Sequence, residues 1–256
     1  FLGLCYAIEG NAECLNKAKK LLVEWAETNE PTGNPIDETN LEGFIFAYDF
    51  IKQGINEKEK SIILDWFLKI QNKQSEWKFG ATSGVNNWKT HNIKMLLMLD
   101  KILGDEVSFK KHIKDAEKHY KANIDKSSGK SYDYEQRNSL KYHTYNLEPW
   151  LEIALLSKDF EHKIKPAFNF LAKQIKEGNI HNQFIGSKVK TDLKRGENGF
   201  GYGLPGSVFD ITRISRAVYS YYALFPEEKD NELIKIADKK PSAKNDFFKL
   251  RTLLYE

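Results

Sequence analysis

The chain has 256 residues, of which 41% are hydrophobic and 29% are charged, a composition typical of a folded globular protein rather than a disordered segment. Lysine and arginine total 39 against 36 aspartate and glutamate residues, so the formal charge is only +3, and the basic residues are scattered. This pattern does not favour nucleic-acid binding, and no apolar run approaches the roughly 18 residues that a membrane span needs.

The chain begins with an apolar stretch, residues 1–4, that reads as the middle or end of a helix, so we expect further helices upstream in the complete protein. Gly10 and Asn11 then favour a turn that folds two helices back on each other. Cys5 and Cys14 flank this turn. They can form a disulfide, which would indicate an oxidising compartment, or remain two reduced thiols in the core; the sequence leaves both open.

Apolar residues recur at steps of three and four along most of the chain, the spacing that places them on one face of an α-helix. Alternating runs of β-branched residues, which would indicate strands, are nearly absent. One of the clearest apolar stripes is formed by Ile62, Ile63, Trp66, Phe67 and Ile70.

Several predicted helices have recognisable end signals. Thr39, with Glu42 three positions later, has the spacing of a capping box, and Asn56 begins a second example. A helix over about residues 86–103 ends at Gly104, a residue suited to a left-handed C-terminal cap. Further helices are predicted over residues 105–123, 138–157, 160–177, 207–224, 227–238 and 243–255.

About ten helices joined mostly by short connections predict an all-α protein, a single domain over residues 1–256 built from antiparallel helical hairpins. Three connections are longer, over residues 29–39, 72–85 and 178–206. Long connections in compact domains are usually functional or disordered. The aromatic residues of the third favour an ordered loop, with a tolerated surface insertion as the alternative.

Motifs for metal and cofactor chemistry are missing. The six histidines form no HExxH pattern and do not pair with the cysteines, so we predict neither a metal site nor a cofactor. His112 and His119 lie seven residues apart on a lysine-rich helix and are expected to be exposed.

A first polar cluster opens the helix predicted over residues 86–103. It contains Asn86, Asn87 and Trp88, with His91 four residues after Asn87 and therefore on the same helix face. A helix N-terminus favours a negatively charged ligand, which makes these side chains candidates for binding one. In the alternative interpretation, an asparagine caps the helix and His91 is a satisfied, partly buried imidazole.

A second cluster lies at the start of the helix predicted over residues 138–157. It contains Arg137, Tyr142, His143 and Tyr145, all residue types that bind a carboxylate or transfer a proton. Tyr142 and Tyr145 share a helix face. The alternative interpretation is aromatic packing with a surface arginine.

Three separated motifs resemble those of alginate lyases and related uronate-polymer lyases. They are Pro-Thr-Gly-Asn-Pro-Ile at 31–36 with Ala-Tyr-Asp at 47–49, Asn-Asn-Trp at 86–88, and Arg137 followed by Tyr-His-x-Tyr-Asn-Leu at 142–147. The resemblance covers roughly residues 1–160 in order. It implies an incomplete (α/α) toroid with helices ahead of residue 1, a secreted or periplasmic location, and an acidic polysaccharide such as alginate or glucuronan as partner.

The resemblance also implies a reaction. Such lyases remove the C5 proton of a uronate and expel the 4-O-linked sugar; an asparagine, a histidine and an arginine bind the carboxylate, and a tyrosine transfers the proton. By position, Asn87 is the carboxylate-binding donor, Arg137 its charge partner and Tyr142 the proton-transfer group.

The chain departs from the family pattern in three places. Trp88 stands where the closest members have histidine, so His91 can supply the imidazole or Trp88 can stack on a sugar. Arg137 lies one or two residues nearer Tyr142 than the family arginine usually does. Free phenols ionise only near pH 10, so a tyrosine base needs a neighbouring cation; His143 or His91 is the alternative base, with tyrosine as the donor.

The third departure is a second candidate tyrosine: Tyr145 competes with Tyr142 because both fit the Tyr-His-x-Tyr pattern. The candidate catalytic residues are therefore Asn87, His91, Arg137, Tyr142, His143 and Tyr145, and the candidate substrate-binding residues are Asn34, Asn86, Trp88 and Tyr202. Two other functions remain open. One is a helical carbohydrate-binding protein without activity, and the other is a toroid glycoside hydrolase, although the motifs offer no obvious pair of carboxylates.

Overall fold

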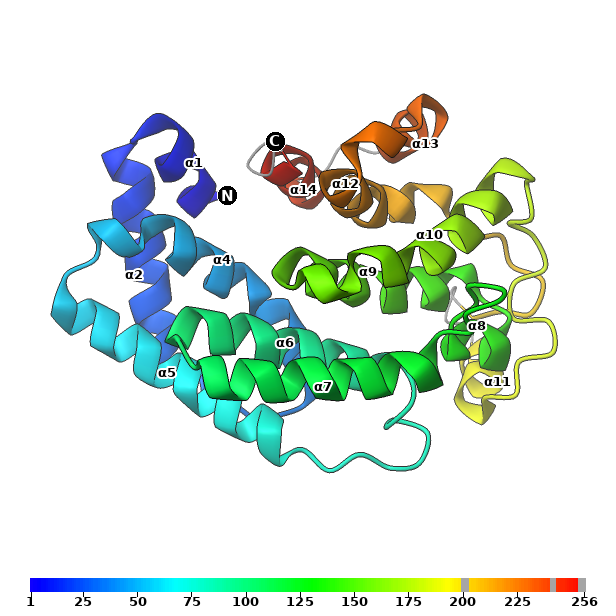
Figure 1. Ribbon diagram of the computed structural model, residues 1–256, viewed down its shortest axis with the longest axis horizontal. Helices are drawn as coiled ribbons and strands as arrows, with labels where there is room; N and C mark the ends of the chain where they lie inside the picture. Colours follow the sequence, from blue (N-terminus) through cyan, green and yellow to red (C-terminus); the bar gives the residue numbers. More distant parts are fainter. Residues whose placement is uncertain (199–202, 240–242, 253–256) are drawn as a thin grey trace. The chain divides into compact units, whose positions relative to one another are not determined.

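The computed structural model describes residues 1–198, 203–239 and 243–252, and within them every regular element is a helix (Figure 1). The predicted all-α class is confirmed. The α-helices are α1 Leu2–Glu9, α2 Ala12–Thr28, α3 Pro35–Glu38, α4 Glu42–Ile51, α5 Glu57–Glu76, α6 Asn87–Leu103, α7 Glu106–Asn123, α8 Tyr132–Arg137, α9 Leu140–Leu156, α10 Glu161–Lys176, α11 Lys190–Glu197, α12 Ser215–Leu224, α13 Asn231–Ala237 and α14 Ala243–Thr252. Short 3₁₀ helices are η1 Thr39–Leu41, η2 Lys52–Gly54, η3 Lys158–Phe160, η4 Ile211–Ile214 and η5 Pro226–Glu228.

The chain divides into two compact units. Unit 1 comprises Phe1–Gly80 and His91–Ala116, and unit 2 comprises Ala81–Thr90 and Glu117–Glu256. The first turn of α6 thus belongs to unit 2 and the rest of that helix to unit 1. The single domain and the (α/α) toroid stay predictions.

The core of unit 1 forms where α1, α2, α4 and α5 pack on one another. The apolar stripe predicted for α5 is confirmed in its main part, because Ile63, Trp66, Phe67 and Ile70 are all buried. The Nε1 of Trp66 donates a hydrogen bond of 3.0 Å to the Oδ1 of Asn29, which ties the end of α2 to α5.

A disulfide between Cys5 and Cys14 joins α1 to α2 in unit 1. The turn between the two helices is the one predicted: Gly10 adopts a φ of 66°, and the Asn11 side chain accepts hydrogen bonds from two backbone N–H groups of the first turn of α2. Of the two states that the sequence left open, the structure contains the bridged one.

The helix-end predictions hold at two places and fail at one. Asn56 caps α5 by accepting a hydrogen bond from the Glu59 N–H, and Gly104 ends α6 with a φ of 72°. The predicted capping box at Thr39 is wrong, because α4 begins only at Glu42 and its N-terminus has no side-chain cap. Both side chains instead bind the buried ammonium of Lys94, and a lysine charge inside a protein needs such partners.

Two histidines on α7 are buried, contrary to the prediction of exposure. His112 Nδ1 lies 2.6 Å from the Asp100 carboxylate in unit 1, and His119 stacks on Trp150 in unit 2. The many lysines of α7 suggested that all of its side chains face solvent, yet His112 and His119 face the interior.

The core of unit 2 is arranged around α9, which contacts α8, α10 and α12. Leu147, Trp150 and Leu151 of α9 are buried, and Phe168 of α10 stacks on Tyr221 of α12 with ring centroids 3.6 Å apart. A buried carboxylate on α9, Glu152, accepts two hydrogen bonds from the guanidinium of Arg251 on α14. The Nη2 of Arg216 on α12 lies 3.8 Å from the same carboxylate.

Gly129 shapes the turn between α7 and α8 in unit 2. Its φ is 73°, and a Cβ at this position would lie 2.0 Å from the backbone oxygen of Pro166 on α10. Only glycine combines this backbone conformation with so close an approach. The turn places α8 directly before α9.

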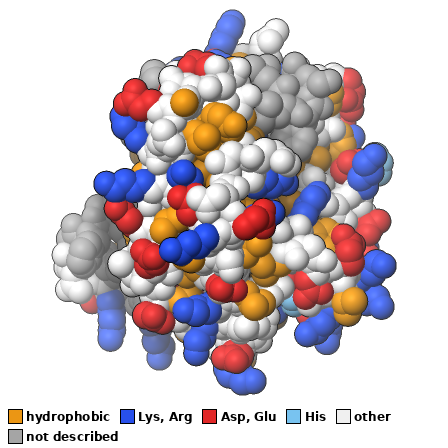
Figure 2. All heavy atoms as spheres, turned by 90° about the vertical axis from the view of Figure 1, so that its left-hand side faces the viewer, with side chains coloured by type: hydrophobic (Ala, Val, Ile, Leu, Met, Phe, Trp, Pro, Cys, Tyr) orange, Lys and Arg blue, Asp and Glu red, His pale blue; other side chains and the backbone are white. Residues whose placement is uncertain are grey.

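Charges of both signs are interspersed on the face of the molecule drawn in Figure 2, without a large area of one sign. Among the described residues, no helix combines the length and the hydropathy that crossing a bilayer requires.

Candidate active site

The candidate carboxylate-binding amide, Asn87, is held from two sides by one carboxylate in unit 2. The backbone N–H of Asn87 donates to Asp133 Oδ2 at 2.8 Å, and its side-chain Nδ2 donates to Asp133 Oδ1 at 2.7 Å. Asn87 is 3% exposed and Asp133 is 1% exposed, so this pair is shielded from water. The two bonds fix which way the amide of Asn87 faces.

Burial of Asp133 has an electrostatic consequence. Desolvation raises the pKa of its carboxyl to about 6, against the smaller opposing effects of the Arg137 charge and the hydrogen bonds from Asn87. Arg137 lies four residues after Asp133 on α8, one helical turn away. Asp133 is therefore coupled both to the candidate amide and to the candidate guanidinium.

Arg137 connects α8 to the candidate proton-transfer group. Its guanidinium carbon lies 3.8 Å from the centroid of the Tyr142 ring, and its Nη1 forms an ion pair with Asp192 of α11. Asp192 is itself buried and accepts a 3.0 Å hydrogen bond from the Ser187 hydroxyl. The Asp192 contact thus holds the arginine against the tyrosine ring.

His143, the other candidate base in this segment, lies in the interior. Its Nδ1 is 3.0 Å from the Ser131 hydroxyl and its Nε2 is 3.0 Å from the Ala167 carbonyl oxygen. The side chain is fully buried, and desolvation lowers the pKa of the imidazole to about 4. These contacts join the starts of α8 and α9 to α10.

A chain of polar side chains fixes the first turn of α6 to α9. The Thr90 hydroxyl donates to Asn146 Oδ1 at 2.7 Å, and Asn146 Nδ2 donates to Asn123 Oδ1 at 2.7 Å. Because the Thr90 proton is used in this way, its oxygen accepts from Nε2 of His119, 2.9 Å away. Burial lowers the pKa of His119 to about 3, which keeps that imidazole neutral.

The other candidates near the starts of α6 and α9 are Asn86, Trp88, Tyr142 and Tyr145. Asn86 caps α6, since its Oδ1 accepts the Trp88 N–H at 3.0 Å, as the alternative interpretation of the first cluster supposed. Trp88 and Tyr145 are half-buried. Tyr142 is half-buried as well, and its ring meets Phe184 edge to face with centroids 6.1 Å apart. The structure thus gathers Asn87, Arg137 and Tyr142 around α8 in unit 2.

Three further candidates remain to be placed in the chain. His91 follows Asn87 by one turn of α6, where the chain passes into unit 1; it is 3% exposed, and its Nδ1 lies 2.8 Å from the Thr39 hydroxyl. Asn34, also in unit 1, caps the short helix α3 by accepting the Ile36 N–H at 3.0 Å. Tyr202 lies outside the described residues.

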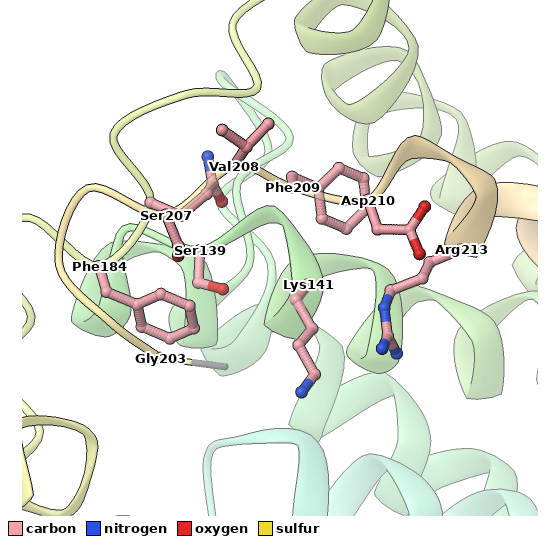
Figure 3. Close-up of a pocket in the computed structure, with 10 residues that line it drawn as sticks. Ser139, Lys141, Phe184, Gly203, Ser207, Val208, Phe209, Asp210 and Arg213 are labelled. Carbon is pink, nitrogen blue, oxygen red and sulfur yellow. The ribbon is translucent and has the colours of Figure 1, made fainter. Parts of the chain in front are cut away.

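A pocket of about 120 Å³ opens at the start of α9 in unit 2 (Figure 3). Lys141 and Arg213 extend in the same direction along it from α9 and η4, and Asp210 is its acidic member. The lining consists of Ser139, Lys141, Gln183, Phe184, Gly203, Ser207, Val208, Phe209, Asp210 and Arg213.

Phe184 in this pocket has an unusual backbone. Its φ is 61°, a left-handed conformation that costs a bulky residue on the order of 1–3 kcal/mol. The strained residue is held by a 2.9 Å hydrogen bond from its N–H to the Asn138 carbonyl oxygen. Gln183, its neighbour, accepts the Leu140 N–H at 2.6 Å. The third long connection is thus ordered where it meets α9.

No local sequence pattern marks Asp133, Lys141 or Arg213 as a site residue. Asp133 lies in a helix of six residues, too short for an apolar period to mark its buried side. Arg213 is 72 residues after Lys141 in the chain, so no local pattern could connect the two. Within the residues that the structure describes, no group of three or more histidine, cysteine or acidic side chains is placed to hold a metal ion.

Comparison with known proteins adds one finding. A family model described as alginate lyase matches residues 1–181, more than half of the chain. Neither a curated protein nor a solved structure gives a match. The matched segment contains the whole arrangement of Asn87, Asp133, Arg137 and Tyr142. The chain therefore belongs to the alginate lyase family.

Proposed function

We propose that the protein is a polysaccharide lyase that cleaves an acidic uronate polymer, alginate or glucuronan, by β-elimination. The observation that carries the proposal is a continuous series of contacts in unit 2. Asn87 is bonded to Asp133, Arg137 follows Asp133 by one turn of α8, and Arg137 lies over the ring of Tyr142. An amide, a guanidinium and a phenol are three of the four groups that the family resemblance implies for this reaction, and a histidine is the fourth.

The reaction begins with a poorly acidic C–H bond next to a carboxylate. Asn87 and Arg137 bind the uronate carboxylate and stabilise the extra negative charge that forms on it when the C5 proton leaves. Asp192 engages Nη1 of Arg137, and the guanidinium carries further N–H donors for the substrate.

Tyr142, as the phenolate beside the Arg137 cation, takes the C5 proton. The electron pair of the C5–H bond forms the C4–C5 double bond, and the C4–O bond to the next sugar breaks. The departing oxygen receives a proton from the same phenol, so the base is regenerated and no oxidant or reductant is consumed. His143 has no exposed surface, so its contribution is to position α9.

The direct test is the ultraviolet absorbance of the new C4–C5 double bond. Wild-type protein mixed with poly-mannuronate, poly-guluronate or poly-glucuronate should produce a rising absorbance with at least one polymer. Binding without an absorbance rise on any of them would contradict the lyase function and favour a carbohydrate-binding protein.

A Tyr142→Phe variant should lose about 10²- to 10⁴-fold in kcat, the usual contribution of a general acid–base group. Tyr6→Phe, a control in unit 1, should retain wild-type kcat. If Tyr145→Phe loses the activity and Tyr142→Phe keeps it, the proton-transfer role belongs to Tyr145.

We also propose that the protein works outside the cytoplasm, in the periplasm or secreted. The Cys5–Cys14 disulfide supports this location, since disulfides persist mainly in oxidising compartments.

A further inference from the structure

The pocket at the start of α9 contains more positive than negative charge. Lys141 and Arg213 contribute two cations and Asp210 one carboxylate. The Asp210 carboxylate already accepts hydrogen bonds from the Thr212 N–H at 3.1 Å and from the Thr212 hydroxyl at 2.6 Å. An anion entering the pocket would therefore meet a net positive environment.

The pocket also adjoins the proposed reaction centre. Its lining residue Phe184 contacts the Tyr142 ring, and its lining residue Lys141 is the chain neighbour of Tyr142 on α9. With about 120 Å³ it is smaller than the roughly 300–1,000 Å³ of a pocket for a drug-sized ligand, so it suits one sugar unit or its acid group. The half-buried Ser207 adds a hydroxyl group and the exposed Val208 adds apolar surface, whereas Ser139, Phe184 and Phe209 are almost fully buried.

We propose that Lys141 and Arg213 bind the carboxylate of the uronate unit adjacent to the one that reacts. This inference rests on the proposed lyase function and makes it more specific. The preferred substrate then has uronates at consecutive positions, because the pocket needs a second acid group next to the one held by Asn87 and Arg137. A polymer in which uronate alternates with a neutral sugar leaves the pocket without its anion.

The test compares Lys141→Gln and Arg213→Gln with wild type on a polyuronate. Each variant should raise KM about 3- to 10-fold with little change in kcat, the range expected for a partly exposed ion pair. Each should also weaken the dependence of KM on salt concentration. Arg213→Lys keeps the charge and should recover most of the wild-type KM. Lys110→Gln removes an exposed charge on α7 in unit 1 and should leave KM unchanged.

A second comparison uses a polymer that alternates uronate with a neutral sugar. If the pocket binds the adjacent carboxylate, wild type should bind the alternating polymer more weakly than it binds a polyuronate. The Lys141→Gln variant should bind the alternating polymer as tightly as wild type does. Binding is measured on the Tyr142→Phe background by titration calorimetry, and circular dichroism confirms that the variants are folded.

The outcomes separate the two proposals. If wild type cleaves a polyuronate and both glutamine variants keep its KM and salt dependence, the pocket assignment is overturned and the lyase function stands. If wild type cleaves no polyuronate, the lyase function fails first, and the pocket assignment fails with it.

Discussion

At the scale of single residues, burial of the Asp133 carboxylate has a cost in stability at neutral pH. Its pKa is raised from 3.8 to about 6, so the folded protein binds this proton more tightly than the unfolded chain does. The stabilising contribution is fully present below about pH 3.8 and is lost as the pH rises through about 6. The ionised form, which accepts both hydrogen bonds from Asn87, is the form that the proposed reaction needs.

A pH profile tests this role of Asp133. We expect wild-type kcat/KM to fall as the pH drops below about 6, because the protonated carboxyl directs an O–H toward a donor of Asn87. Asp133→Asn should lower kcat/KM about 10- to 100-fold near neutral pH, the effect of losing charged hydrogen bonds, and should abolish this acid limb.

Asp125→Asn is the matched control for that profile. Asp125 is exposed, and its pKa is lowered to about 2 by hydrogen bonds from Ser127 and Ser128, so its replacement should leave the acid limb in place. An acid limb that persists in Asp133→Asn would show that another group controls it.

At the scale of elements, the sequence predicted long helices well and short ones poorly. The helix over 86–103, its Gly104 end and the Asn56 cap follow from local rules, and the structure agrees. The short helices α3 and α8 were not predicted, since four and six residues are too few to display an apolar period.

The Thr39 prediction failed for a different reason. Its side chain binds the buried Lys94, which is 55 residues away in the sequence, so a tertiary contact replaced the local cap. The candidate site likewise depends on tertiary contacts that local sequence does not predict. Asn87, Arg137 and Tyr142 could be chosen from their types and order, but their link through Asp133 exists only in the folded chain.

The turn between α7 and α8 offers a prediction at this scale. Gly129→Ala should lower the free energy of unfolding by at least about 2 kcal/mol, because a Cβ would collide with the Pro166 carbonyl oxygen in addition to opposing a φ of 73°. Gly178→Ala is the matched control. Its φ is 70° with nothing within 4 Å of the added Cβ, so it should cost only about 1 kcal/mol.

Urea denaturation of both variants measures the difference. Equal losses of stability in the two variants would mean that the backbone of α10 moves away from the turn at no cost, contrary to the close packing described.

At the scale of the whole molecule, the interior of unit 2 includes residues beyond the end of the family match. The match ends at residue 181, yet α9 inside it carries the buried Glu152, whose partners Arg216 and Arg251 lie beyond it. Residues after 181 are therefore part of the same hydrophobic and ionic interior of unit 2. Local sequence rules could not pair Glu152 with an arginine 99 residues away.

Arg251→Met should consequently destabilise the protein by about 3 kcal/mol, since among the described residues it leaves the buried Glu152 carboxylate with the more distant Arg216 as its cation. Lys249→Met, on the same helix, disturbs an exposed pair with Asp238 and should cost no more than about 1 kcal/mol. Thermal denaturation of the two variants provides the comparison. Similar melting temperatures would mean that α14 contributes little to unit 2.

Helix α8 carries Asp133 and Arg137 one turn apart within only six residues. A shift of this helix would move Arg137 and the carboxylate that holds Asn87 together, so in the proposed reaction the two contacts to the sugar acid cannot be changed separately. If the proposed function holds, a change of the accepted uronate epimer therefore requires the exchange of residues 131–137 as one segment, with Gly129 retained.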